Sequence, residues 1–263
     1  MHPTQDKPDD LSRLRKDAME IFQSGLLSAD PAIAIQRHLK LCNNILTIGD
    51  LSFDLANFEE ILVIGAGKAS AAMAKELENI MGSKISRGII NVKYDHTANL
   101  NNIELIEAGH PIPDENGQAG AKKIFDVAKN AHEKTLIFCL ISGGGSALSP
   151  LPCEGISLAE KQETTKILLS CGARIHEINT IRKHLSLIKG GGLAKAAFPA
   201  TIISLILSDV VGDDLDIIAS GLTVPDTGTF KECKDIIESY NIAKKTAQEC
   251  PGSYKYWLCR ESL

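Results

Sequence analysis

Three apolar runs, each ending in a glycine-rich or acidic segment, constrain the fold of this chain most strongly. Residues 61–64, 135–141 and 201–207 are short and rich in branched aliphatic side chains. Such runs are typical of strands that are buried on both faces of a sheet. Segments with helical periodicity lie between them. We therefore predict an α/β fold, a three-layer α/β/α sandwich with a mostly parallel sheet.

The same periodicities define the other expected elements. An amphipathic helix is expected over 11–25, and a second helix begins at Asp30-Pro31 and runs to about Cys42. The remaining expected elements are strands over 89–94 and 103–107 and helices over 115–131, 158–171 and 178–197, the last interrupted at 190–192.

Composition narrows the classes of function. The formal net charge of -5 gives no basic surface of the kind that nucleic-acid binding needs. No apolar run is long enough to span a bilayer, and residues 1–10 lack the pattern of a signal peptide. The seven cysteines are odd in number and include no CxxC pair, which favours reduced thiols. We predict a cytoplasmic protein with no membrane or nucleic-acid partner, and leave a homo-oligomer open.

The ends of the three apolar strands predict the position of the site. In open parallel sheets, ligands bind beyond the carboxyl ends of the strands. The segments that follow the three runs are 65–68, 142–146 and 208–214, and each is rich in glycine or acidic residues. Their coincidence at one edge of the sheet predicts a ligand site there.

The first segment, Gly65-Ala66-Gly67-Lys68, matches neither of two familiar nucleotide motifs. Ser70 stands where a dinucleotide fingerprint needs glycine or alanine, and Ala69 stands where a P-loop needs serine or threonine. What remains is a tight strand-to-helix turn that places Gly67 and a lysine beside a predicted ligand site. Because a cation in the first helical turn opposes the helix dipole, Lys68 is either a solvated side chain or a functional one.

The second segment consists of Ser142, Gly143, Gly144, Gly145 and Ser146. Three successive glycines are costly to order and leave backbone N–H groups exposed. A loop of this kind after a buried strand favours a cradle for phosphate or carboxylate, with a packing loop as the alternative.

A basic run follows in the predicted helix over 178–197. Arg182 could hold a carboxylate through two parallel hydrogen bonds, and Lys189 could neutralise phosphate charge. We expect Gly190 and Gly191 to offer N–H donors to an anion. For Lys183 we expect an ordinary solvated position.

The third segment carries Asp209 and Asp213 directly after the apolar run over 201–207. Hard carboxylate oxygens suit Mg²⁺, which proteins bind through one or two carboxylates plus substrate phosphates. The alternative is a capped turn. We predict that Asp209, together with Asp213, holds Mg²⁺ or orients a substrate hydroxyl.

Taken together, these segments resemble the glycerate 2-kinase family that carries a C-terminal MOFRL domain. The resemblance covers roughly residues 11–245. It rests on five ordered blocks, VIGAGKASAAMAKELE, EAGHPIPDENG, LISGGGSALSPLP, INTIRKHLSLIKGGGLA and SDVVGDDLDIIASGLTVPD.

The resemblance implies a Rossmann-like domain, a smaller second domain and an active site between them. It implies transfer of a phosphoryl group from ATP to D-glycerate, giving 2-phosphoglycerate and ADP with Mg²⁺, and a catalytic role for Lys68.

Two departures from the family pattern stand out. Leu222 replaces a usual proline, and the chain stops where the family continues into its second domain, which carries an arginine regarded as catalytic. We therefore expect an N-terminal α/β domain over 1–248, an irregular tail over 249–263 from a truncated product, and no second domain.

We predict a glycerate 2-kinase whose partners are glycerate and ATP. One alternative is a nicotinamide-dependent hydroxypyruvate reductase, against which the lack of a dinucleotide fingerprint argues. The other is a catalytically inactive fragment that binds a ligand. Nicotinamide absorbance would reveal the first, and binding without turnover the second.

Overall fold

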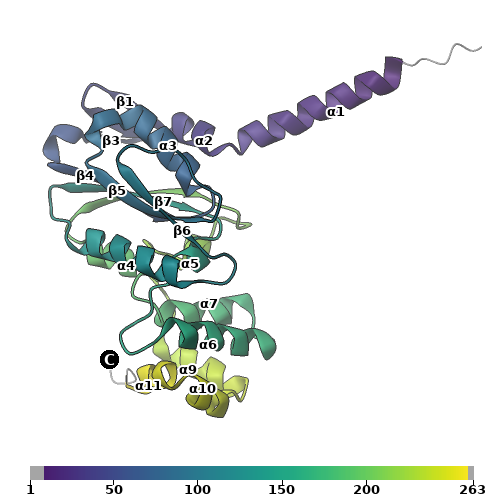
Figure 1. Cartoon of the computed structure of the whole chain (residues 1–263), viewed down its shortest axis with the longest axis vertical. Helices are drawn as coiled ribbons and strands as arrows, with labels where there is room; N and C mark the ends of the chain where they lie inside the picture. Colours follow the sequence, from purple (N-terminus) through teal and green to yellow (C-terminus); the bar gives the residue numbers. More distant parts are fainter. Residues whose placement is uncertain (1–8, 260–263) are drawn as a thin grey trace, which may run out of the picture.

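The computed structural model describes residues 9–259, and its centre is a parallel sheet with the strand order β6-β5-β4-β7-β8 (Figure 1). The strands are β4 (Glu60–Ala66), β5 (Arg87–Lys93), β6 (Ile103–Ala108), β7 (Thr135–Ser142) and β8 (Thr201–Leu207). β7 is buried along its whole length and β4 after its first residue, which explains their continuous apolar sequences. Counted in chain order, the strands run 3-2-1-4-5, the order of a doubly wound, Rossmann-like sheet. The order reverses between β4 and β7.

One face of this sheet is covered by α2 (Pro31–His38), α3 (Ser70–Met81) and a small antiparallel sheet. The small sheet consists of β1 (Leu39–Cys42), β2 (Ile45–Ile48) and β3 (Leu51–Asp54), and the short helices η1 (Leu55–Asn57) and η2 (Gly82–Lys84) follow β3 and α3. Val63 and Phe138 of the central sheet and Leu77 of α3 are fully buried in the same hydrophobic cluster.

The predicted second helix ends earlier than expected. Leu39 already has extended backbone angles, and β1 pairs with β2 through the turn at Asn43, whose φ is 55°. The prediction of a helix as far as Cys42 is therefore wrong, because Leu39 and Leu46 are buried as members of a hairpin.

The other face is covered by α4 (Glu115–Lys129), α5 (Gly145–Leu148), α8 (Gly192–Ala197) and η3 (Ile218–Ser220). Ile64 and Ile137 from the sheet share a cluster with Ile124 of α4. α4 begins where it does because the Asp114 side chain accepts a hydrogen bond of 2.8 Å from the Gly117 N–H. The two covered faces confirm the predicted three-layer sandwich.

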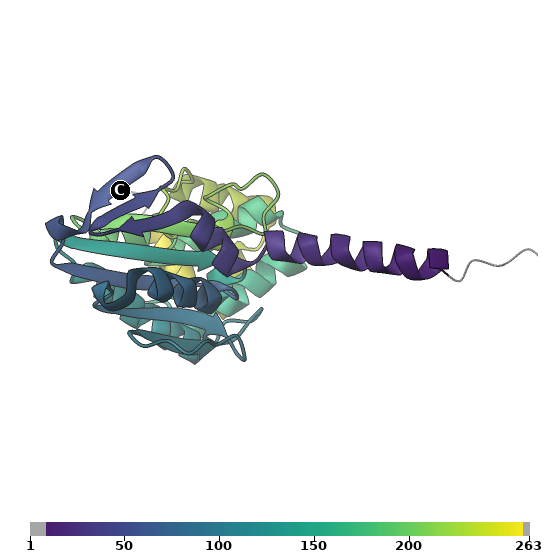
Figure 2. The ribbon, with the colours of Figure 1, turned by 90° about the horizontal axis from the view of Figure 1, so that it is seen from above.

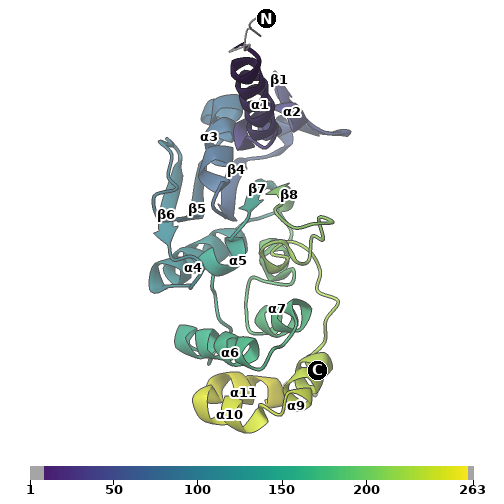
Figure 3. The ribbon, with the colours of Figure 1, turned by 90° about the vertical axis from the view of Figure 1, so that its right-hand side faces the viewer.

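A cluster of helices lies beyond the layers of the sandwich, at the bottom of Figures 1 and 3. It contains α6 (Leu158–Ser170), α7 (Ile175–His184), α9 (Phe230–Ser239), α10 (Ala243–Glu249) and α11 (Pro251–Cys259). Ile167, Ile181 and Ile237 form its buried core. It therefore has a hydrophobic core separate from those of the two sheet faces.

The segment predicted to be an irregular tail is largely helical. Cys250 separates α10 from α11, and Pro251 opens α11 because proline fits the first helical turn. The Gly252 N–H donates to Glu160 Oε1 of α6 at 2.7 Å, which attaches α11 to the cluster. The prediction of an irregular tail is wrong for 251–259, while 260–263 lie outside the described residues. The domain boundary at 248 stays a prediction.

The first helix, α1 (Asp9–Ser28), extends away from the rest of the chain (Figure 2). Its existence confirms the predicted helix over 11–25. Its large apolar side chains remain exposed, with Ile21 at 74% and Phe22 at 61% of full exposure. Between residues 9 and 259, no helix combines the length and apolar character needed to cross a membrane.

Candidate functional site

The first two predicted segments meet where the strand order reverses. β4 and β7 are parallel neighbours with Ala66 paired to Ile141, so the turn at 65–68 and the loop at 142–146 leave the sheet side by side. The Lys68 N–H donates to the Gly143 carbonyl at 3.0 Å, and the Ala69 N–H donates to Ser142 Oγ at 3.0 Å. These two bonds fix the backbone of Lys68 against the loop.

Close backbone approach explains the glycine at position 67. A Cβ at Gly67 would overlap Ser142 Oγ and would lie 2.6 Å from the Ser142 nitrogen. Ser142 is itself buried, and its hydroxyl also lies 3.2 Å from Ser70 Oγ. Gly67 and Ser142, both predicted to bind substrate or nucleotide, therefore hold the turn and the loop together.

Four chemical groups converge around Gly143 and Gly144. A Cβ at Gly144 would lie 2.9 Å from His110 Cδ2 and 3.4 Å from Lys68 Cε, and one at Gly143 would overlap Asp209 Oδ2. The structure thus brings together an ammonium group, an imidazole, a carboxylate and a glycine loop.

The loop offers free backbone donors to this space. Among the hydrogen bonds of the described residues, the N–H groups of Gly143, Gly144 and Gly145 reach no protein acceptor. Three successive N–H groups without acceptors beside a lysine form a concave surface suited to an anion. The geometry favours the anion cradle over the packing loop.

His110 belongs to this site but was not predicted from the sequence. Burial lowers its pKa, and the positive charges of Lys68 and Lys93 lower it further, whereas Asp209 opposes them. The imidazole is therefore neutral near pH 7. The signal that could have found His110 is its place just after β6, at the carboxyl edge of the same sheet.

A second group of cations surrounds Ser146 at the far end of the loop. Arg182 Nη2 donates to Ser146 Oγ at 2.7 Å, and Lys189 Nζ donates to the Ser146 carbonyl at 2.7 Å and also to its hydroxyl. Ser146 Oγ lies 2.8 Å from Ser220 Oγ. Lys161, which the sequence did not indicate, donates to the Leu185 carbonyl at 3.1 Å.

These three cations have no carboxylate partner within the part of the chain that the structure describes. Lys161 and Lys189 are buried, with 6% and 3% exposure. Burial lowers the pKa of Lys161 to about 7 and lowers the pKa of Lys189 and of Arg182, and Arg182 and Lys161 add repulsion at Lys189. A bound anion would offset this repulsion.

Lys161→Met is expected to raise the free energy of unfolding near pH 6 and to lose that advantage toward pH 10. The folded pKa is about 7 and the ordinary value is 10.5, so the unfolded chain binds more protons between these pH values. The stability of the unsubstituted chain therefore rises with pH through this window, and the variant lacks that contribution.

Urea unfolding of both proteins at about pH 6, 8 and 9.5 checks this expectation. Lys195→Met, at an exposed lysine of α8, serves as the control and should leave the pH dependence unchanged. A stability difference for Lys161→Met that stays constant with pH would contradict the assignment of a lowered pKa.

The second glycine cluster does not offer donors to an anion. The Gly190 N–H donates to the Ser220 carbonyl at 3.0 Å, and the Gly191 N–H donates to the Gly221 carbonyl at 2.7 Å. The predicted donation of these two groups to a ligand is therefore wrong. Their role is to fix the turn at 220–221, which holds Lys189 near Ser146.

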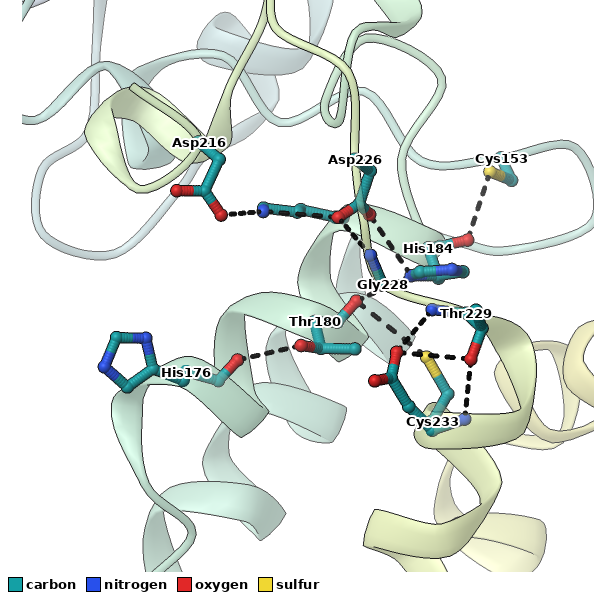
Figure 4. A network of polar contacts seen from close by, with 11 residues as sticks. Cys153, His176, Thr180, His184, Asp216, Asp226, Gly228, Thr229 and Cys233 are labelled. Carbon is teal, nitrogen blue, oxygen red and sulfur yellow. Dashed lines mark hydrogen bonds and ion pairs between the residues drawn. The ribbon is translucent and has the colours of Figure 1, made fainter. Parts of the chain in front are cut away.

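The expectation of a solvated Lys183 is also wrong. Its side chain is 6% exposed, and its ammonium group lies 2.9 Å from Asp216 Oδ2 and 3.3 Å from Asp226 Oδ1. Figure 4 shows Asp226 reaching His184 and Gly228 in the same network. The network ties α7, which also carries Arg182, to the segment that precedes α9.

Asp226→Asn is expected to lower the free energy of unfolding by about 1–3 kcal/mol, because a charged hydrogen-bond partner of buried Lys183 is lost. Urea denaturation measures the change. Asp235→Asn, at an exposed position of α9, is the matched control and should stay within about 0.5 kcal/mol of the unsubstituted chain. Equal losses in the two variants would show that the network contributes nothing specific.

The two predicted metal ligands differ in their positions. Asp209 lies against Gly143 and is exposed to solvent, so its carboxylate fits an ion held mainly by substrate phosphates. Asp213 is also exposed, has a φ of 53° and donates its N–H to the Val210 carbonyl at 3.1 Å. Across residues 9–259, His, Cys, Asp and Glu side chains form no group of three that could hold a metal. One carboxylate thus faces the loop, and a role for Asp213 stays a prediction.

Comparisons with known proteins agree with this architecture. A glycerate 2-kinase from Pyrococcus horikoshii is 43% identical over 235 residues, which are 89% of this chain and 52% of that protein. A protein from Agrobacterium vitis named putative hydroxypyruvate reductase is 41% identical over 228 residues, 87% of this chain and 49% of that one. A crystal structure of a Pyrococcus horikoshii protein superposes with a TM-score of 0.86 at 41% identity, covering 95% of this chain and 56% of that chain.

The chain spans about half the length of the curated relatives it matches. Residues 17–251 match the family described as "Domain of unknown function (DUF4147)". Because this match covers most of the sequence, the chain belongs to the DUF4147 family.

Proposed function

We propose that this chain carries the phosphoryl-transfer site of a glycerate 2-kinase, which phosphorylates the 2-hydroxyl of D-glycerate with ATP. The observation that carries the proposal is the convergence of Lys68, three free N–H groups and Asp209 at one edge of the sheet. These are the groups that bind and neutralise anions. Similarity to the glycerate 2-kinase from Pyrococcus horikoshii supports the choice of substrate.

In the proposed reaction the bond between the γ-phosphorus and the β–γ bridging oxygen breaks, and a bond from the glycerate 2-hydroxyl oxygen to phosphorus forms. The hydroxyl proton leaves to solvent, and ADP retains the bridging oxygen. Such transfers depend mainly on positioning and on neutralising charge. Lys68 supplies a positive charge beside the transferring group, and the loop N–H groups hold an anionic oxygen.

Neutral His110 has an N–H to donate and cannot add a second repelling cation beside Lys68. Asp209 would hold Mg²⁺, with Asp213 as the second carboxylate that we predict. The bound ion would neutralise phosphate charge.

We place the chain in the cytoplasm, with glycerate and ATP as small-molecule partners and with no membrane or nucleic-acid partner. The net charge of -5 supports the last point. We keep the prediction of an N-terminal α/β domain over 1–248. A homo-oligomer would place the exposed apolar side chains of α1 against another copy.

Release of ADP in the presence of ATP, Mg²⁺ and D-glycerate tests the function. We expect release that depends on glycerate. ATP binding without release would support the alternative of an inactive ligand-binding fragment. No release and no ATP binding would contradict the proposal.

The hydroxypyruvate reductase alternative has one observation in its favour, the name of the relative from Agrobacterium vitis. A loss of nicotinamide absorbance with hydroxypyruvate would establish it. We expect no such loss, because Ser70 and Lys93 stand where a dinucleotide fingerprint needs other residues.

A further inference from the structure

We infer that the cavity beside the transfer site binds the nucleotide, with the triphosphate on Lys161, Arg182 and Lys189 and the nucleoside on an aliphatic wall. This inference rests on the proposed kinase function and adds what that function leaves open. It assigns the nucleotide to the cavity and leaves glycerate to the end of the loop that carries Lys68.

The cavity has the size and lining of a nucleotide site. Its volume is about 600 Å³, and it lies between α6, α7 and the segment 111–113. Sites for ligands of the size of a nucleoside are typically a few hundred to a thousand Å³ and mostly apolar, with a few polar groups that fix orientation. A three-carbon acid would leave most of this volume empty.

The cavity also has large aliphatic side chains that are open to solvent. Ile112, Leu169 and Ile175 line the cavity while remaining 71%, 64% and 59% exposed. Large aliphatic side chains gathered at the mouth of a cavity mark a contact surface for an apolar ligand group. A nucleoside has that character, and glycerate does not.

The charge at the base of the cavity distinguishes the two substrates further. Lys161, Arg182 and Lys189 line the same cavity and repel one another. The single carboxylate of glycerate would offset one of these charges, whereas a triphosphate carries enough negative charge to offset all three. The cations therefore match the nucleotide better.

The loop over 142–146 gives the direction in which a bound triphosphate would extend. Ser146 lines the cavity and contacts both Arg182 and Lys189, while Gly144 of the same loop lies beside Lys68. A triphosphate that starts on the cations and extends along the loop would bring its terminal phosphate toward Lys68. The same loop thus contacts both the cavity and Lys68.

Calorimetric titration of the chain with a non-hydrolysable ATP analogue tests the assignment. Lys161→Met should weaken binding by about tenfold or more, because a buried charge-assisted contact to phosphate is lost. Leu169→Asp should weaken it by a similar factor, because a carboxylate would stand on the aliphatic wall.

Matched controls lie outside the cavity. Lys195→Met removes an exposed lysine of α8, and Leu51→Asp changes a leucine of β3 that is 63% exposed, close to the 64% of Leu169. Both should bind the analogue within about twofold of the unsubstituted chain. In steady-state kinetics, Lys161→Met should raise the KM for ATP. It should leave the KM for glycerate within about twofold of the value for the unsubstituted chain.

Unchanged nucleotide affinity in Lys161→Met and Leu169→Asp, together with glycerate-dependent turnover, would overturn the inference and leave the kinase standing. A rise in the KM for glycerate with no rise for ATP would place the acid in the cavity and would also overturn it. Failure of the unsubstituted chain to bind the analogue and to release ADP would remove the proposed function itself.

Discussion

Lys68→Ala is expected to lower kcat for glycerate-dependent ADP release by about 100- to 1,000-fold, the usual loss when a fixed group that stabilises transition-state charge is removed. Lys68 is held by its N–H bond to Gly143 and lies beside His110 and the loop. No water molecule in its place could supply the same fixed positive charge. Steady-state kinetics at saturating ATP and glycerate measure the loss.

Lys75→Ala is the matched control for this substitution. Lys75 lies about two turns further along the chain in α3 and is likewise half-buried, but it is not among the groups that approach the loop. Its removal should change kcat by less than about threefold. Equal kcat values for Lys68→Ala and the unsubstituted chain would exclude Lys68 from the transfer step.

Gly67→Ala is expected to lower the free energy of unfolding by about 3 kcal/mol or more. The new methyl group would overlap Ser142 Oγ and press on the Ser142 backbone, which is itself part of the buried strand β7. The Ser142 backbone cannot withdraw without moving the end of β7 away from the turn. Urea denaturation measures the change.

Gly25→Ala provides the comparison for an added methyl group without a clash. A Cβ at Gly25 meets nothing within 4 Å, and the residue lies inside α1. Alanine should be neutral there or stabilising by up to about 1 kcal/mol. If Gly67→Ala were as stable as Gly25→Ala, the close packing of the turn against the loop would be contradicted.

Much of the fold follows from the sequence because the sheet has an unusually clear pattern. Strands buried on both faces require continuous apolar runs, and 136–141 of the buried strand β7 is such a run. β8 lies at an edge of the sheet and is only partly buried, and its run includes Ser204. The hairpin of β1 and β2 was missed because its short strands follow a helix directly and are only partly buried. The end of α2 is decided by tertiary packing of Leu39 rather than by local preference.

The site could be predicted only as far as strand ends identify it. Lys68, Gly143–Gly145 and Asp209 all follow apolar strands, so one rule indicated them together. Lys161 lies inside a helix whose sequence resembles a solvated one, and only the packing of α6 against α7 reveals its burial.

Dependence on tertiary packing also explains two wrong expectations. Lys183 was expected in solvent because its acidic partners, Asp216 and Asp226, are distant in sequence. Gly190 was expected to offer a donor because the carbonyl that its N–H reaches, at Ser220, is equally distant. Pairings that depend on loop conformation cannot be read from local spacing.

The product of the reaction tests the central claim most directly. Phosphorus NMR of the chain incubated with ATP, Mg²⁺ and D-glycerate should show ADP and 2-phosphoglycerate accumulating together, and neither without the protein. Consumption of ATP without any phosphoglycerate, or unchanged ATP from a chain that also fails to bind it, would contradict a glycerate-phosphorylating site at Lys68 and the loop.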